Sequence, residues 1–508
     1  KPACFNHPVD RIELIETHIS WVILTGDFAY KIKKPVNFGF LDFSTLKKRH
    51  HYCLDELRLN RRLAPDIYLE VVTITGTTTN PVMEGKGETV DYAVKMKQFP
   101  QSAQLDNMLA ADGLDARHMD AIANMIADFH QHIDIADEAV SYGDKSFVIK
   151  PVEENFTQIK LHIDTRPYAS VLAELEGWNQ TLFEELGDTF VQRKSDGFIR
   201  ECHGDLHLRN MLWLNEHPLA FDCIEFNAEL RWIDVISDLA FLVMDLQARQ
   251  QHQLANHLLN RYLEITGNYP GLTVLPFYLA YRAMVRAKVS ALRLEQEHIN
   301  IQERELTQTA FVSYLKLAKR YTQRGKTRLI IMHGLSASGK SSVSQQLLDP
   351  IGAIRIRSDV ERKRLFNTAP EDHAEDKMHS GLYSAESTRQ TYARLIELAR
   401  SIINAGFSVI VDATFLKQTQ REPFQRLAEN LNTTYLILDV IAPDDILRRR
   451  IINRKHDISD AGIAVLEHQI KNRLPLHQKE ADNVITVDST KTLDINALVD
   501  KISRITNE

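Results

Sequence analysis

Apolar residues recur with two different periods along this chain, and the change of period separates three stretches. Near the start, short apolar runs predict strands over residues 11–16, 20–25 and 27–34. Between residue 119 and about residue 320, apolar side chains recur every three or four positions, which predicts a succession of helices. Beyond residue 328, helical segments alternate with five short apolar runs, at 329–333, 353–357, 407–411, 435–440 and 484–487.

The alternation in the last stretch is typical of an α/β domain with a parallel sheet and helices on both faces of that sheet. The segment between residues 319 and 328 is basic, polar and poor in apolar residues, so we expect a domain boundary there. The sequence therefore predicts two domains, over residues 1–322 and 327–508.

Composition narrows the class of protein. The chain has 508 residues, of which 44% are hydrophobic and 25% charged, as expected for a globular protein of about two to four domains. A net charge of -7 gives no reason to expect a nucleic-acid or membrane surface. No apolar run approaches 18 residues, the first residues form no charged-then-hydrophobic leader, and the four cysteines show no metal spacing. We therefore expect a cytoplasmic protein with reduced thiols and no membrane partner.

The clearest chemical signal lies at residues 202–210, which read Cys-His-Gly-Asp-Leu-His-Leu-Arg-Asn. An apolar run follows this segment, and a second apolar strand leads into Asp222. Phosphoryl transfer needs one Asp to accept the proton of the attacking hydroxyl, with an Asn and a second Asp to hold Mg²⁺ on the nucleotide phosphates. Asp205, Asn210 and Asp222 supply that set, so we expect Asp205 to be the base and the other two residues to be metal ligands.

The pattern His-x-Asp-x-x-x-x-Asn followed by Asp resembles the catalytic and metal loops of the aminoglycoside phosphotransferases, which are relatives of the protein kinases. The family's loop reads His-Gly-Asp-x-His-x-x-Asn, and every signature position matches. The resemblance implies an α+β bilobal kinase-like fold for residues 1–322, with a small lobe over about 1–100 and a helical lobe over about 101–322. It also implies that Asp238, on the helix after the metal loop, supports the catalytic loop.

A strand lysine completes the nucleotide site in such folds. Phe28-Ala29-Tyr30-Lys31 copies the spacing of the Val-Ala-Ile-Lys strand of protein kinases, whose lysine pairs with nucleotide phosphates. Lys33 lies on the same face of the strand and is the alternative. We expect Lys31 to take this role, because the small Ala29 leaves room for adenine. Glu56 is the expected acidic partner of this lysine, with Asp55 as the alternative.

Two neighbouring segments refine this interpretation. Residues 16–20 stand where protein kinases have a glycine-rich loop, but they contain no glycine, which argues against a protein kinase more than against nucleotide binding. The strand over residues 91–96 leads into residues 97–100, the position of the hinge whose backbone groups bind adenine in kinase-like folds.

A second nucleotide signal opens the last stretch. The strand over residues 329–333 runs into Gly-x-x-x-x-Gly-Lys-Ser, a phosphate-binding P-loop followed by a helix. Its backbone amides cradle phosphates, its lysine reaches the terminal phosphates and its first serine ligates Mg²⁺. The expected nucleotide-binding residues are Gly334, Ser336, Ala337, Ser338, Gly339, Lys340, Ser341 and Ser342, with Ser341 also a metal ligand.

Acidic residues follow two further strands of this domain, where a parallel sheet places its ligands. Together with the P-loop they resemble the small P-loop kinases grouped with polynucleotide 5′-kinase, chloramphenicol phosphotransferase and the zeta toxins. The resemblance implies that Asp359 is the base for the acceptor hydroxyl, that Arg362 binds the substrate and that Asp412 ligates metal or water. It also implies that Arg450 and Arg454 form a lid pair over the transferring phosphate.

The leading hypothesis is a bifunctional ATP-dependent phosphotransferase with two kinase sites that act on hydroxyl groups of small molecules. ATP and Mg²⁺ are the expected cofactors. Two alternatives stay open: one domain is a nucleotide-binding regulatory module, or the P-loop domain phosphorylates nucleic-acid ends. The acidic balance of the chain argues against the nucleic-acid alternative, since backbone phosphates demand a basic track.

Overall fold

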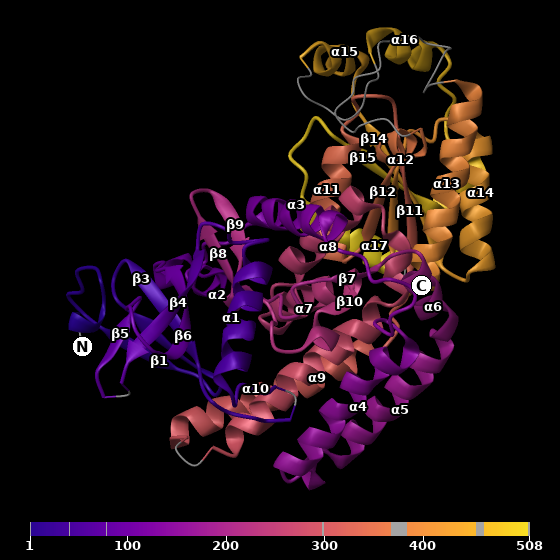
Figure 1. Cartoon of the computed structure of the whole chain (residues 1–508). Helices are drawn as coiled ribbons and strands as arrows, with labels where there is room; N and C mark the ends of the chain where they lie inside the picture. Colours follow the sequence, from indigo (N-terminus) through magenta and orange to yellow (C-terminus); the bar gives the residue numbers. More distant parts are fainter. Residues whose placement is uncertain are drawn as a thin grey trace. The chain divides into compact units, whose positions relative to one another are not determined.

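The computed structural model describes residues 2–39, 41–77, 79–296, 299–366, 384–453 and 462–505 (Figure 1). The chain packs as two compact units. The first comprises Lys1–Arg249 and Phe277–Arg320, and the second comprises Gln250–Pro276 and Tyr321–Glu508.

The first unit begins with a six-stranded antiparallel sheet, which Figure 1 draws in indigo and violet. Its strands, in spatial order, are β1 (Glu13–Glu16), β2 (Ser20–Leu24), β3 (Phe28–Lys33), β6 (Thr89–Lys97), β4 (Tyr68–Gly76) and β5 (Pro81–Met83). One face of the sheet packs on α1 (Leu46–Asn60), around a core that includes Ala29, Cys53 and Val94. Thr45 caps α1 by accepting a hydrogen bond from the Lys48 amide.

Helices and two small two-stranded antiparallel sheets make up the rest of this unit. The helices are α2 (Leu105–Ala110), α3 (Ala116–His132), α4 (Lys145–His162), α5 (Ala169–Glu185), α6 (Gly187–Ser195), α7 (Val235–Ala248), α9 (Leu275–Leu294) and α10 (Ile301–Tyr321). One of these sheets pairs β7 (Ile199–Glu201) with β10 (Trp232–Asp234), and the other is the hairpin of β8 (Met211–Leu214) and β9 (His217–Ala220). Helix α7 is buried on every side over its first three turns, which explains its almost continuous apolar sequence.

The second unit is built on a five-stranded parallel sheet, drawn in orange to yellow in Figure 1. Its strands, in spatial order, are β12 (Ile354–Arg357), β13 (Val409–Asp412), β11 (Arg328–His333), β14 (Thr434–Ile441) and β15 (Val484–Asp488). Helices α11 (Lys340–Ile351) and α17 (Ile495–Ile505) share one core with the sheet, and α13 (Ala385–Asn404) and α14 (Gln418–Asn430) also pack on its strands. Because helices cover both faces, the central strand β11 is apolar and buried at successive positions.

The expected fold class is confirmed for both parts of the chain. The first expected strands appear with slightly shorter bounds, and all five apolar runs beyond residue 328 are strands of one parallel sheet. Among the described residues, none of the helices combines the length and apolar character that a membrane span requires.

Residues 250–276 add a feature that the sequence pattern did not indicate, because they pack within the second unit although they precede the last helices of the first. They form α8 (His252–Thr266) and a short 3₁₀ helix (Tyr269–Thr273). Asn260 of α8 donates to the Ala353 carbonyl at 2.9 Å and accepts from the Arg355 amide at 2.8 Å. One side-chain amide thus satisfies the open edge of β12 in the way a neighbouring strand would.

We predict that Asn260→Ala locally destabilises this edge, because it removes the partner of the buried Arg355 amide and leaves the Ala353 carbonyl with only its bond from Asn256 at 3.2 Å. The expected cost is about 1–2 kcal/mol, seen as about tenfold faster hydrogen exchange at the Arg355 amide. The exposed Gln253 of the same helix provides the matched control, Gln253→Ala. Unchanged exchange at Arg355 in the Asn260 variant would contradict this account of the edge.

Candidate active sites

The hairpin of β8 and β9 brings the two expected metal ligands of the first unit together. Its turn residues Asn215 and Glu216 both have positive φ, as a two-residue hairpin turn with the correct twist requires. Met211 pairs with Ala220, so the residues that flank the two strands meet at the open end of the hairpin. The Phe221 amide donates to the Asn210 carbonyl at 2.9 Å, which places Asn210 beside the segment that carries Asp222.

Asp205 lies against Asn210 at this open end. The Asn210 side-chain amide donates to the Asp205 carboxylate at 2.9 Å and to the Asp205 carbonyl at 3.1 Å. Although burial raises the pKa of Asp205, the nearby His207 imidazole and the Arg286 guanidinium lower it more, so the pKa lies below its ordinary value. The carboxylate is therefore ionised at neutral pH, and its side chain is 35% exposed, so an acceptor hydroxyl can reach it.

His203 and Asp238 fix the backbone of the loop that carries Asp205. The fully buried Asp238 carboxylate accepts from the amides of His203 at 3.1 Å and Gly204 at 2.8 Å. His203 donates from Nε2 to the Phe221 carbonyl and accepts the Asp205 amide at Nδ1, so its ring is neutral. Burial lowers the pKa of His203 and stabilises this neutral form.

Gly204 is required by the same turn. Its φ is +86°, and a Cβ at this position would lie 2.7 Å from the Leu230 carbonyl oxygen. Arg282 donates to the Gly204 carbonyl at 3.0 Å and to the Ser237 carbonyl at 3.1 Å. The loop is therefore held from both its amide and its carbonyl side.

Both candidate lysines of β3 reach the same carboxylate. Lys31 pairs with Glu56 at 2.8 Å and with Asp222 at 2.5 Å, and Lys33 pairs with Glu56 at 2.7 Å and with the buried Glu225. The two lysines differ in their surroundings. Lys33 is almost fully buried, at 1% exposed, whereas Lys31 lies beside the partly exposed side chain of Asp222, at 46% exposed. Lys31 is thus the lysine that faces the expected metal ligand, and Lys33 completes a buried ion cluster.

The donor set of this site fits Mg²⁺. Asp222 offers a carboxylate that is 46% exposed. Asn210 donates from its side-chain nitrogen to Asp205, so its side-chain oxygen is not used in that bond. Carboxylate and amide oxygens are the hard ligands that Mg²⁺ prefers. Asp222 takes a φ of +62°, and its amide donates to the Tyr68 hydroxyl at 3.2 Å, so its backbone is held in this position.

The P-loop of the second unit connects β11 to the first turn of α11. Gly334 has a φ of +142°, and a Cβ there would lie 2.4 Å from the Val440 carbonyl oxygen, so only glycine fits. Lys340 is nearly buried and donates to the carbonyls of Gly334 at 3.0 Å and Leu335 at 2.8 Å. The lysine therefore lies folded against the loop whose amides form the phosphate cradle.

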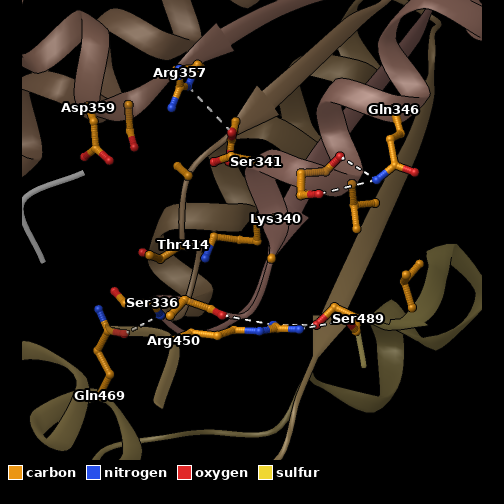
Figure 2. A pocket seen from close by; sticks show the side chains of 18 of the residues that line it. Ser336, Lys340, Ser341, Gln346, Arg357, Asp359, Thr414, Arg450, Gln469 and Ser489 are labelled. Carbon is orange, nitrogen blue, oxygen red and sulfur yellow. Dashed lines mark hydrogen bonds and ion pairs between the residues drawn. The ribbon is translucent and has the colours of Figure 1, made fainter. Parts of the chain in front are cut away.

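A cavity of about 780 Å³ opens beside this loop (Figure 2). It is lined by Ser336, Ala337, Gly339, Lys340, Ser341 and Ser342 from the loop and by Asp359, Arg362, Asp412 and Arg450 from elsewhere in the unit. The other two P-loop residues expected to bind nucleotide, Gly334 and Ser338, do not line this cavity but a smaller hollow.

The acidic residues of the cavity stand at the carboxyl ends of neighbouring strands. Asp412 ends β13 and Asp359 follows β12. Arg362 pairs with Asp359 at 3.3 Å, and the Ser344 hydroxyl donates to Asp412 at 3.4 Å. Figure 2 shows Asp359 and Arg357 at one end of the view and Arg450, Gln469 and Ser489 at the other, with Lys340 between them.

Arg450 contacts the P-loop from α15 (Asp444–Ile452). It donates to the Ala337 carbonyl at 3.2 Å and to the Ser489 hydroxyl and carbonyl at 2.9 and 2.8 Å. It therefore joins the loop to the chain just after β15. Arg454, expected as its companion, lies outside the described residues.

Several cavity residues carry no sequence signal of their own. Gln469 accepts the Ser336 amide at 2.8 Å, and Ser489 anchors Arg450. Arg357 lines the cavity two residues before Asp359. In the first unit, Glu225 and Tyr68 likewise become part of the site only through contacts between segments that are distant in the sequence. A motif search could have flagged Arg357 from its position, but the other four lack any such pattern.

Comparison with known proteins relates both units to described families. A model of a phosphotransferase enzyme family matches residues 96–275, and a model of an AAA domain family matches residues 329–476. An uncharacterized protein of Mycobacterium tuberculosis is 30% identical over 462 residues, which cover 90% of this chain and 90% of that protein.

Two further matches cover only part of the chain. A protein of Dictyostelium discoideum named a probable gluconokinase is 24% identical over 176 residues, which are 32% of this chain and 81% of that protein. Among solved structures, an amicoumacin kinase in complex with AMP-PNP and Ca²⁺ is 11% identical, with a TM-score of 0.40, and the match covers 62% of this chain and 90% of that one.

We predict that Lys31→Met and Lys33→Met fail in different ways. Lys31→Met removes the cation expected to pair with the phosphates, so nucleotide affinity at this site falls. The fold keeps its stability, because Glu56 stays paired with Lys33 and Asp222 is accessible to water. Lys33→Met leaves buried Glu225 without its lysine and should lower the free energy of unfolding by about 3–5 kcal/mol. Nucleotide titration and denaturant unfolding of both variants measure the two effects.

Lys34→Met is the matched control, because Lys34 pairs with the largely exposed Glu16 and should change neither quantity much. A Lys33 variant with unchanged stability and lost nucleotide binding would assign the phosphate-pairing role to Lys33 instead.

Proposed function

This chain is an ATP-dependent kinase that belongs to the same family as the mycobacterial protein, and from that premise we propose that it carries two separate phosphotransfer sites. The resemblance drawn from residues 202–222 and from the P-loop is confirmed by the two family models. We propose further that both sites transfer the terminal phosphate of ATP to hydroxyl groups of small molecules.

One observation carries the proposal of two sites: each unit holds its own phosphate-binding cation, candidate metal ligand and candidate base. In the first unit these are Lys31, Asp222 and Asp205. In the second they are Lys340, Asp412 and Asp359, around one cavity. A module that only senses nucleotide needs no base, so the presence of a candidate base in each unit favours two enzymes over one enzyme and one sensor.

In the first site, ionised Asp205 accepts a hydrogen bond from the acceptor hydroxyl and orients its oxygen toward the phosphate. Its lowered pKa suits a reaction in which the proton leaves late and positioning dominates. Lys31 holds the nucleotide phosphates, with Glu56 fixing its direction. Mg²⁺, held by Asn210 and Asp222, would neutralise charge on the phosphates.

In the second site, the P-loop amides and Lys340 bind the phosphates, and Ser341 and Asp412 supply oxygen ligands that suit Mg²⁺. Asp359 receives the acceptor hydroxyl, and Arg362 binds the acceptor beside it. Arg450 braces the loop against the chain after β15, which keeps the cradle in shape.

The acceptor of at least one site is proposed to be a small hydroxyl-rich molecule. The name of the Dictyostelium relative, a probable gluconokinase, supports this class. We also propose a cytoplasmic location, because all four cysteines are described and none forms a disulfide, as expected in a reducing compartment.

The number of nucleotide sites tests the proposal directly. Full-length protein should bind two equivalents of a non-hydrolysable ATP analogue in isothermal titration with Mg²⁺. Lys31→Met and Lys340→Ala should each remove one equivalent and leave the other, because each lysine serves one unit. A wild-type stoichiometry of one would overturn the assignment of two sites.

Variants of the two bases separate catalysis from nucleotide binding. Asp205→Asn and Asp359→Ala should each leave nucleotide affinity at their own site within about threefold, yet lower transfer there by about 100-fold or more. Screening a metabolite pool for ATP consumption by wild type and both variants assigns each acceptor to one site. If Asp359→Ala matches wild type with every acceptor that supports turnover, the second unit is no kinase.

A further inference from the structure

Glu264, which lies far from the P-loop in the sequence, has its carboxylate behind one wall of the cavity beside that loop. Glu264 of α8 pairs with Arg355 at 3.3 Å and with Arg357 at 3.5 Å, and its side chain is only 10% exposed. It also pairs with Arg261 at 3.4 Å. A single buried carboxylate thus faces three guanidinium groups within the second unit.

Arg357 connects this carboxylate to the cavity. It is the last residue of β12, in register with Asp412, the last residue of β13, and its side chain lines the cavity (Figure 2). Its Nε lies 3.9 Å from the Asp412 carboxylate. The guanidinium therefore stands between two carboxylates, one behind the cavity wall and one at the expected metal position.

A second path links the same two carboxylates without reaching the cavity. Arg355 donates to the Ser344 hydroxyl at 3.4 Å, and that hydroxyl donates to Asp412 at 3.4 Å. Arg355 is absent from the residues that line the cavity. Of the three arginines that pair with Glu264, only Arg357 lines the cavity, so only Arg357 can meet a ligand there.

Without Glu264, the balance of charges around Arg357 would change. Of the two carboxylates beside Arg357, only Asp412 would remain. A closer pair between Arg357 and Asp412 would partly neutralise Asp412, the residue expected to ligate the metal. Although burial raises the pKa of Glu264, the guanidinium groups of Arg357, Arg355 and Arg261 lower it more, so the group is ionised at neutral pH. A guanidinium is suited to planar, bidentate recognition of phosphate, and Arg357 lines the cavity beside the P-loop.

We propose that Glu264 is a positioning residue of the P-loop site, which holds Arg357 directed at the place where the transferring phosphate lies. This inference rests on the proposed function of the second unit and adds two residues to it. Arg357 contacts the transferring group, and Glu264 acts through Arg357. The carboxylate comes from a segment within residues 96–275, the range matched by the phosphotransferase family model.

Binding of Mg²⁺–ADP with aluminium fluoride, a mimic of the transferring phosphate, tests the inference without a known acceptor. Isothermal titration uses full-length protein in a Lys31→Met background, so that only the second site binds. Arg357→Gln should weaken binding of the mimic by about 100-fold and Glu264→Gln by about tenfold. Affinity for Mg²⁺–ADP alone should stay within about threefold in both variants.

The double variant decides whether the two residues act together. If Glu264 acts through Arg357, Glu264→Gln adds less than about twofold to the loss already caused by Arg357→Gln. Independent, multiplying losses would overturn the inference. The matched control is His257→Gln, which removes a pair between α8 and Asp349 that does not involve the arginines, and it should leave binding of the mimic unchanged. An equal loss in the control would show that Glu264→Gln acts only by loosening α8.

Lys340→Ala in the same background separates this inference from the proposed function. If Lys340→Ala leaves Mg²⁺–ADP binding unchanged, the P-loop is no nucleotide site and the function proposed for the second unit fails. If Lys340→Ala abolishes that binding while Glu264→Gln leaves the mimic bound as in wild type, only the role of Glu264 and Arg357 is wrong.

Discussion

The loop of the first unit that carries Asp205 depends on one buried carboxylate, that of Asp238. It accepts two consecutive backbone amides of the loop, which would otherwise be buried without partners, at a cost of about 1–3 kcal/mol each. These two bonds fix the turn at Gly204, the turn directs Asp205 toward Asn210, and Asn210 in turn meets the segment that carries Asp222. The order of the site follows from this support together with the bond from Arg282 to the Gly204 carbonyl.

The two units solve the same electrostatic problem with different folds. Each must hold several carboxylates and cations close together where phosphates bind. The first unit joins Lys31, Lys33, Glu56 and Glu225 into one cluster of alternating charge. The second places its acids at the ends of parallel strands and balances them with arginines from neighbouring elements. In the first unit the carboxylates expected to meet ligands, Asp205 and Asp222, are the more exposed ones, whereas in the second unit Asp412 and Lys340 are themselves nearly buried.

Sequence reasoning succeeded where the chemistry is local in the chain. The hairpin flanked by Asn210 and Asp222 and the strand–loop–helix of the P-loop lie within short segments, and the fold class follows from hydrophobic periodicity. The sequence favours Lys31 over Lys33 only through the small size of Ala29, because a strand places both lysines on one face. The surrounding carboxylates, which distinguish the two, cannot be predicted from the strand. Sequence reasoning missed Gln469 because its contact joins segments more than a hundred residues apart, and no periodicity encodes such a contact.

The packing of residues 250–276 has a consequence for how the chain is synthesised and folded. During translation, α8 leaves the ribosome before any strand of the sheet whose edge it covers. Asn260 and Glu264 therefore cannot form their contacts near residue 355 until that part of the chain has been synthesised. The first unit is likewise incomplete until Phe277–Arg320 follows. Neither unit can finish folding from one uninterrupted stretch of chain, so folding strictly domain by domain is not available to this protein. A nascent chain that stalls between residues 276 and 328 would present α8 without the strand edge it is built to cover.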